Sequence, residues 1–178
     1  ATRRLFYQEA MRLSRLDHPN IVKVLDYGEE GEQPYLVMEY LTGTPLHRHL
    51  GKDTLSRDDK GEIMRQTAVA LVAAHRGIDG TGPLVHLDLK PEHIFVERTD
   101  GGWHVKVIDF GIAEIVAAHD TTEAPASTPA PRHYAGTLPY MAPERWQGVI
   151  DPRCDLYSLG VILYEFIADA KPFEAACH

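Results

Sequence analysis

The stretch that decides the fold is residues 86–94, which read His-Leu-Asp-Leu-Lys-Pro-Glu-His-Ile. It offers a carboxylate in Asp88, an ammonium group in Lys90 and an imidazole in His93, five residues after the carboxylate. A carboxylate can take up a proton, an ammonium group can neutralise negative charge, and an imidazole can bind a metal ion. A short polar triplet of this kind arises by chance in many proteins, so its weight depends on the later segments of the chain.

A predicted strand and a turn come after this stretch. Residues 103–108 read Trp-His-Val-Lys-Val-Ile, an alternating and β-branched pattern that is typical of a strand. Asp109, Phe110 and Gly111 come directly after it. A strand that delivers an aspartate into a turn made permissive by glycine suits a metal-binding carboxylate. We therefore expect Asp109 to be a ligand of a divalent metal ion.

Two further blocks stand in the second half of the chain. Residues 136–144 read Gly-Thr-Leu-Pro-Tyr-Met-Ala-Pro-Glu, and residues 155–160 read Asp-Leu-Tyr-Ser-Leu-Gly. Each block alone can be read as a turn or a helix cap. In this order and at this spacing, the four blocks resemble those of Ser/Thr protein kinases, most of all the bacterial eukaryotic-type kinases, over about residues 6–173. The resemblance implies an α+β, two-lobed protein kinase fold that is partial here, with a small-lobe remnant in residues 1–43 and an incomplete, mainly helical large lobe in residues 44–178.

The resemblance implies transfer of the γ-phosphoryl group of ATP to a protein hydroxyl. Asp88 would be the catalytic base and Lys90 the contact to the migrating phosphoryl group. Lys90 together with Thr137 implies hydroxyl substrates of the Ser/Thr kind. Asp109 would bind Mg²⁺, and His93 stands where the family has the asparagine that binds a second metal ion. Imidazole is a softer ligand than Mg²⁺ prefers, so Mn²⁺ is the alternative cofactor.

The resemblance also implies a set of nucleotide contacts. Glu9 matches the helical glutamate that pairs with the ATP-anchoring lysine, although an exposed helical glutamate is the plainer interpretation. Met38 matches the gatekeeper beside the adenine pocket, and Glu39 to Leu41 match the hinge whose backbone bonds adenine. Phe95 would pack under the adenine ring, or else it is an ordinary aromatic residue of a core strand.

Structural roles are implied by the same resemblance. Leu13, Val24, His86 and Phe110 would stack as a spine that joins the two lobes. Asp155 would hold the backbone of the catalytic segment from below, although it can also be read as an acidic residue at a helix N-terminus.

Two departures from the family pattern agree with each other. Leu87 replaces the arginine that usually receives a phosphate of the activation loop, and His133 stands where a phosphorylated threonine is common. Leu87 cannot make charge-assisted bonds to a phosphate, so we expect activation without such a phosphate. His93 favours a second hypothesis, a pseudokinase that acts as a binding or scaffold module, while a small-molecule phosphotransferase of the same fold is a third.

Composition restricts the class of partner and compartment. The chain has 178 residues and a formal charge of −8, which disfavours nucleic acid as a partner. No apolar run of about 18 residues is present, so we expect no membrane contact. Cys154 and Cys177 are too few for a disulfide framework, and a cytoplasmic location is expected. The sequence starts at the helix that carries Glu9, so the glycine-rich loop and the ATP-anchoring lysine of the family are absent, and this segment alone is expected to be inactive.

Hydrophobic periodicity and turn residues predict the local elements. A short helix is predicted at residues 46–50. The next predicted helix is capped by Ser56 and buries Ile63, Ala70, Leu71 and Ala74, and residues 77–82 are predicted to form a linker. Predicted helices cover residues 5–16, 46–50, 56–75 and 151–168, predicted strands cover residues 21–27, 35–40, 94–97 and 103–108, and predicted connections cover residues 28–33, 42–45 and 117–133. The last helix is predicted to carry its apolar face on Leu156, Leu159, Leu163, Phe166 and Ile167.

Overall fold

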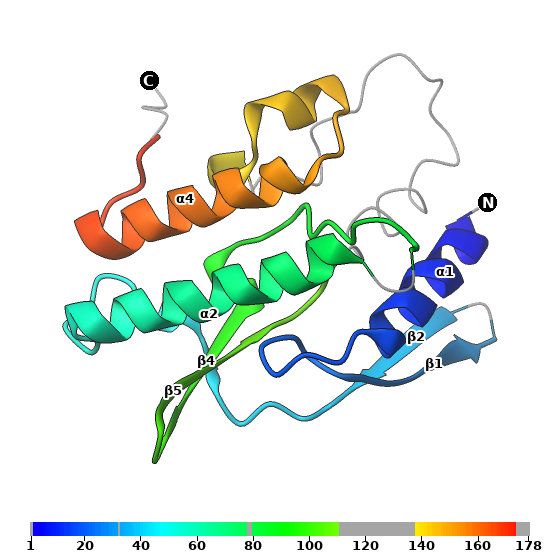
Figure 1. The fold of residues 1–178 in the computed structure, drawn as a ribbon, viewed down its shortest axis with the longest axis horizontal. Coiled ribbons are helices and arrows are strands. Elements are labelled where there is room, and N and C mark those ends of the chain that lie inside the picture. Colours follow the sequence, from blue (N-terminus) through cyan, green and yellow to red (C-terminus); the bar gives the residue numbers. More distant parts are fainter. Residues whose placement is uncertain (1, 32, 78–79, 111–137, 174–178) are drawn as a thin grey trace.

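The computed structural model describes residues 2–31, 33–77, 80–110 and 138–173. Figure 1 shows helix α2 (Arg57–Arg76) lying between helix α4 (Pro152–Ala168) and a sheet, while helix α1 (Thr2–Arg15) packs on a second sheet. Thr137 and the predicted loop at 117–133 lie outside the described residues. Within the described part of the chain, no helix is both long and apolar enough to span a membrane.

Helix α1 and a hairpin form the N-terminal part of the fold. The buried positions of the helix recur at helical spacing and are Phe6, Ala10 and Leu13. The helix ends shortly before Pro19, because the residue before a proline avoids helical geometry. Strand β1 (Val24–Glu30) pairs antiparallel with β2 (Gln33–Met38), which confirms the predicted helix and hairpin. The turn is tighter than the predicted residues 28–33, because β1 continues to Glu30.

The predicted start of the first strand was wrong. Residues 21–27 were expected to be one strand, but β1 begins at Val24. The preceding residues pair with a different strand: the Val22 N–H donates to the Val107 carbonyl at 2.9 Å, and the Val107 N–H donates to the Asn20 carbonyl at 2.9 Å. A β-rich run therefore splits between two sheets and joins them, which local residue preference does not reveal.

The second sheet has the strand order β3-β4-β5. Strand β3 (Thr44–Pro45) pairs with β4 (Ile94–Thr99), which pairs with β5 (Gly102–Val107) through the predicted hairpin turn. The segment at 42–45 is therefore partly a strand and not only a connector. The predicted short helix after it is the 3-10 helix η1 (Leu46–His49). The division of the chain into two lobes at residue 43 remains a prediction.

Helix α2 begins and ends as its sequence predicts. The Ser56 hydroxyl accepts from the Asp59 N–H at 3.1 Å, and the Asp59 carboxylate accepts from the Ser56 N–H at 3.0 Å, a reciprocal cap. The predicted buried positions Ile63, Ala70, Leu71 and Ala74 are all fully buried. Gly77 ends the helix at φ +69°, where a Cβ atom would lie 2.2 Å from the Gly82 carbonyl oxygen. Only glycine fits there.

Helix α4 has the predicted bounds, but only Phe166 of its predicted apolar face is fully buried. Its buried residues are Cys154, Asp155, Ser158, Val161, Ile162 and Phe166. The exposed fractions of the predicted face reach 52% at Leu156, 40% at Leu163 and 68% at Ile167. The helix is apolar on all sides, so hydrophobicity does not select its inner face. Hydrogen bonds of polar residues select the inner face instead. The Ser158 hydroxyl donates to the Tyr140 carbonyl at 2.7 Å, and Asp155 accepts backbone hydrogen bonds from the 86–94 stretch.

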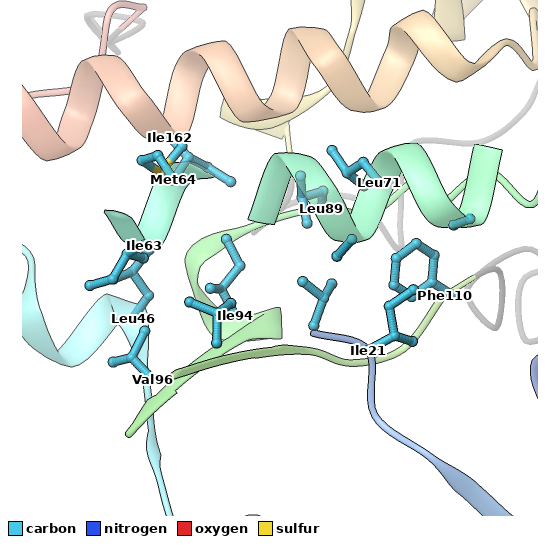
Figure 2. Close-up of a cluster of buried hydrophobic side chains, with 14 of the residues drawn as sticks. Ile21, Leu46, Ile63, Met64, Leu71, Leu89, Ile94, Val96, Phe110 and Ile162 are labelled. Carbon is cyan, nitrogen blue, oxygen red and sulfur yellow. The ribbon is translucent and has the colours of Figure 1, made fainter. Parts of the chain in front are cut away.

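The core runs between α2 and the sheet of β4 and β5 (Figure 2). Val96 of β4 lies beside Leu46 and Ile63, and Ile162 of α4 lies beside Met64 of α2 (Figure 2). Leu89 of the 86–94 stretch is also fully buried in this cluster. The middle of that stretch is therefore anchored in the core, and its polar neighbours are held near the surface.

Candidate active site

The backbone at the start of the 86–94 stretch is held by Asp155 of α4. The N–H groups of His86 and Leu87 each donate to the Asp155 carboxylate at 2.8 Å, and His75 Nε2 donates to it at 2.7 Å. Asp155 has no exposed surface, so its charge is balanced by these three donors. The expectation that Asp155 holds this segment is confirmed.

Leu87 adopts a left-handed backbone conformation, with φ +66°. Such a conformation costs a non-glycine residue roughly 1–2 kcal/mol. It turns the chain between buried His86 and Asp88, and the hydrogen bonds that the His86 and Leu87 N–H groups donate to Asp155 offset the cost. Asp109, at the end of β5, has φ +61° in the same way. Strained backbone of this kind clusters at functional sites.

Asp88 and Lys90 lie on either side of buried Leu89 and point to each other. The Lys90 ammonium donates to Asp88 Oδ2 at 2.9 Å. Their side chains keep 17% and 21% of their surface exposed, so both are held yet accessible. A carboxylate and a cation are thus fixed together at the surface of the core.

His93 ends the short helix η2 (Pro91–His93) and reaches back to Asp88. Its Nδ1 lies 2.9 Å from the Asp88 carbonyl oxygen, which can only accept, so Nδ1 carries the proton. Nε2 lies 3.7 Å from Asp109 Oδ2. A bond from the Ile108 N–H to the His93 carbonyl, at 3.0 Å, joins the two segments.

His86 fills the space behind His93. Its ring stacks on that of His93 with centroids 5.6 Å apart, and it contacts the Phe110 ring at 4.7 Å. His86 Nε2 donates to the Ile108 carbonyl at 2.9 Å. Burial lowers the pKa of His86, which keeps the ring neutral. Leu13, Val24 and Phe110 belong to one buried cluster, and the predicted contact between His86 and Phe110 is present.

The predicted hinge lines a cavity of about 240 Å³. Of the predicted adenine contacts, Glu39, Leu41 and Phe95 line it, while Met38 does not and instead packs half-buried against the core. Glu39 accepts from the Lys106 ammonium and, at 2.9 Å, from a backbone N–H. Burial alone would raise the pKa of Glu39, but these bonds and the charge of Lys106 outweigh it, so the pKa lies below its ordinary value.

Glu9 is half-buried and points into the fold, so it is not the exposed helical glutamate of the plainer interpretation. Its Oε1 accepts from Arg12 at 3.0 Å, and its Oε2 is buried with no hydrogen-bond partner among the described residues. Arg12 also donates to the carbonyls of Gly82 and Pro83, each at 2.9 Å. Helix α1 is thereby tied to the segment that leads into residues 86–94.

The residues present suit a divalent ion in part. His93 Nε2 and Asp109 Oδ2 lie 3.7 Å apart, so the two residues offer a nitrogen and an oxygen to the same space. No group of three or more such ligands occurs in the part of the chain that the structure describes. Two protein ligands are what Mg²⁺ or Mn²⁺ bound with nucleotide phosphates and water needs.

Sequence reasoning missed Arg12, Lys106 and His75 as supports of the site. Arg12 lies on the same helix as Glu9, but its carbonyl acceptors lie about 70 residues away in sequence. His75 stands in the last turn of α2, where a basic residue is ordinary. No local signal distinguishes these residues from solvated ones.

Comparison with known proteins identifies the fold and family. The protein kinase domain family model matches residues 2–178, and the chain belongs to this family. It is 42% identical to the serine/threonine-protein kinase pkn3 of Myxococcus xanthus over 96% of this chain and 30% of that protein. Among solved structures, the PknI kinase domain of Mycobacterium tuberculosis matches with a TM-score of 0.70 and 28% identity, over 99% of this chain and 60% of that one. Rad53 residues 1–466 in complex with AMP-PNP match with a TM-score of 0.70 and 28% identity, over 97% of this chain and 40% of that one.

The predicted α+β protein kinase fold and the resemblance to Ser/Thr kinases are confirmed. The chain spans less than a third of the length of pkn3 and of Pkn1, a second kinase of Myxococcus xanthus that it matches.

Proposed function

We propose that the protein to which this chain belongs transfers the γ-phosphoryl group of ATP to Ser or Thr hydroxyls of proteins. The observation that carries this proposal is the convergence of Asp88, Lys90, His93 and Asp109, joined by contacts of 2.9 to 3.7 Å although they come from two separate segments. Phosphoryl transfer depends on positioning and on charge neutralisation, and these groups supply both.

Asp88 accepts a hydrogen bond from the substrate hydroxyl and aims its oxygen at the phosphorus. Lys90, 2.9 Å from Asp88, neutralises charge on the equatorial phosphoryl oxygens. Asp109 and His93 would hold a divalent ion, which would supply further positive charge to the phosphates. Because Leu89 is fixed in the core, Asp88 and Lys90 keep their spacing during the transfer.

The nucleotide occupies the hinge side of the site in this proposal. Glu39, Leu41 and Phe95 line the cavity on this side. Glu9, whose second carboxylate oxygen is buried with no partner among the described residues, is proposed to pair with the lysine that anchors the ATP phosphates. The likeness to Rad53, solved with AMP-PNP, supports ATP as the nucleotide. Thr137, outside the described residues, is proposed to contact the substrate hydroxyl region and favour Ser and Thr.

The test is transfer of labelled phosphate from γ-labelled ATP to a library of Ser-, Thr- and Tyr-containing peptides by the full-length protein. Asp88→Asn should lower kcat by roughly 10²-fold or more, the usual contribution of a positioned base. Asp100→Asn, in the exposed turn between β4 and β5, is the matched control and should not change the rate. Transfer that is unaffected by Asp88→Asn, or that goes to Tyr alone, would overturn the proposal.

A pseudokinase is the second candidate, and His93 is the observation that favours it. The imidazole stands where the family has a metal ligand, and its Nδ1–H donates a hydrogen bond to the Asp88 carbonyl. A pseudokinase would bind nucleotide in the cavity without transferring phosphate. Binding of ATP with no transfer to any peptide, in the presence of Mg²⁺ and of Mn²⁺, would select this function.

A further inference from the structure

Arg12 of α1 binds two parts of the fold at once. Nη1 of its guanidinium group donates to Glu9 Oε1 at 3.0 Å, and Nη2 donates to the carbonyls of Gly82 and Pro83, each at 2.9 Å. The side chains of Arg12 and Glu9 are 21% and 23% exposed, so both are largely enclosed. Because the planar guanidinium group holds its donors in a fixed fork, these three bonds set where Glu9 lies relative to residues 82–83.

The carbonyls that accept from Arg12 are themselves anchored to the end of α2, which lies beside α1 in Figure 1. The Leu84 N–H donates to the Ala74 carbonyl at 3.0 Å. Gly82 has φ +79°, a left-handed conformation that glycine adopts at little cost, and its carbonyl oxygen packs closely on Gly77. The acceptor side of the contact is therefore a fixed support, to which α1 is attached through Arg12.

The rotation of α1 about its own axis depends on this attachment. The apolar side of the helix packs on β1 and β2, and burial of apolar surface has no preferred direction. Charge-assisted hydrogen bonds do have a preferred direction. Glu9 and Arg12 are three residues apart and so lie on one face of the helix. A rotation that broke the bonds to residues 82–83 would therefore also displace Glu9.

Arg12 occupies only one of the two Glu9 oxygens. Glu9 Oε2 is buried and has no hydrogen-bond partner among the described residues. A buried acceptor without a partner is costly, so this oxygen marks a place for a donor that the described residues do not supply. In the proposed function that donor is the lysine that anchors the ATP phosphates. The bond from Arg12 to Oε1 leaves Oε2 as the oxygen that meets it.

We propose that Arg12 is a positioning residue for ATP binding, which holds α1 against residues 82–83 and thereby directs Glu9 Oε2 toward the anchoring lysine. The proposal rests on the proposed function, since Glu9 acts on the phosphates through that lysine. Arg12 touches neither the nucleotide nor the lysine, and its whole effect on ATP passes through Glu9.

The test measures nucleotide binding to the full-length protein by isothermal titration calorimetry, with ATP and with adenosine at one fixed Mg²⁺ concentration. Arg12→Met keeps much of the apolar stem and removes all three hydrogen bonds. It should weaken ATP binding by roughly tenfold, the scale of one charge-assisted hydrogen bond, and change adenosine binding by less than about twofold, because adenosine has no phosphates. Arg15→Met, at an exposed arginine in the same last turn of α1, is the matched control and should change neither affinity.

The comparison of the two ligands separates positioning from a general loss of structure. A variant that is misfolded or distorted throughout loses ATP and adenosine binding alike, and equal losses would refute the proposal. An Arg12→Met variant that binds ATP as tightly as the parent protein would refute it as well.

A double-mutant cycle tests whether Arg12 acts through Glu9. Once Glu9 is replaced by Gln, adding Arg12→Met should weaken ATP binding by less than about twofold, since coupled residues do not contribute independently. Losses that multiply in the double variant contradict this route. Failure of the proposed function gives a different result: the parent protein then transfers no phosphate to Ser or Thr peptides, while the difference between ATP and adenosine binding in Arg12→Met remains.

Discussion

Replacing Asp155 by Ala should destabilise the domain more than any change at the polar residues of the 86–94 stretch itself. Asp155 is completely buried and accepts from the backbone N–H groups of His86 and Leu87, each at 2.8 Å. It also accepts from His75 Nε2 at 2.7 Å. In the Ala variant the buried His86 N–H and the partly buried Leu87 N–H lose this partner, and Leu87 keeps its unfavourable φ without the bond that offsets it.

The magnitude can be worked out from these contacts. Leaving a buried donor unsatisfied costs about 1–3 kcal/mol, and the partly buried Leu87 donor costs less than the buried His86 donor, so the two together cost at most about 6 kcal/mol. Deleting the carboxyl group leaves a small cavity, whereas His75, with 15% of its side chain exposed, can hydrogen-bond to water instead. Marginal domains have about 5–15 kcal/mol of stability, so the variant should lose a large share of it.

The assay is equilibrium urea denaturation followed by tryptophan fluorescence, with phosphate transfer measured below the transition. Asp151→Ala is the matched control on the same helix, because Asp151 is the α4 N-cap and accepts from the Arg153 N–H at 2.8 Å. Loss of that cap should cost only about 1 kcal/mol. If the midpoints of the Asp155→Ala and Asp151→Ala variants coincide, the reasoning from buried donors is refuted.

Two further substitutions test the remaining polar supports. Gln66→Leu should lower the free energy of unfolding by roughly 2–4 kcal/mol, because the buried Gln66 amide accepts from the Val105 N–H at 2.9 Å and donates through its nitrogen. In the exposed control Gln8→Leu, the same free energy should change by no more than about 0.5 kcal/mol in urea denaturation. Glu39→Gln should make the unfolding free energy less dependent on pH in acid, because the folded-state pKa of Glu39 lies below its ordinary value of 4.5. The bond to Lys106 stabilises the fold above that pH and is lost as the pH falls through the lowered pKa, so the difference in unfolding free energy between parent and variant should shrink. A difference that stays constant from pH 7 to pH 3 contradicts the assignment.

Local chemistry explains which parts of the fold the sequence predicts. The Ser56 cap, the Gly77 terminus and the bounds of α4 are set by residues within one turn of the feature, and all are as predicted. The run at residues 21–27 was divided incorrectly because its first residues pair with Val107, far away in the chain. Hydrophobic periodicity could not identify a pairing that depends on the position of a second sheet.

The buried face of α4 could not be predicted from hydrophobic periodicity either. Apolar residues surround the helix, and the sequence favoured the face with the most leucine. The structure buries the face that holds Asp155 and Ser158, because their partners are backbone groups of the 86–94 stretch and the Tyr140 carbonyl. A buried polar group is informative only when its acceptor or donor is known.

The candidate site divides in a similar way. The resemblance identified Asp88, Lys90 and Asp109 by residue type and order, and the structure brings them together with His93. The resemblance could not identify which His93 nitrogen carries the proton, because the proton's position depends on the backbone carbonyl of Asp88, and residue types do not reveal that contact.

The supports of the site have a further consequence for where sensitivity to mutation should lie. Two of its residues, Leu87 and Asp109, sit in left-handed backbone that their own side chains do not favour. Such conformations persist only where surrounding structure over-determines them. For Leu87 that structure is Asp155 of α4, and for the approach to the segment it is Arg12 of α1, both distant in sequence. The geometry of Asp88 is thus imposed by two helices from outside the motif, and substitutions at Arg12 and Asp155 should disturb the site as strongly as substitutions within it.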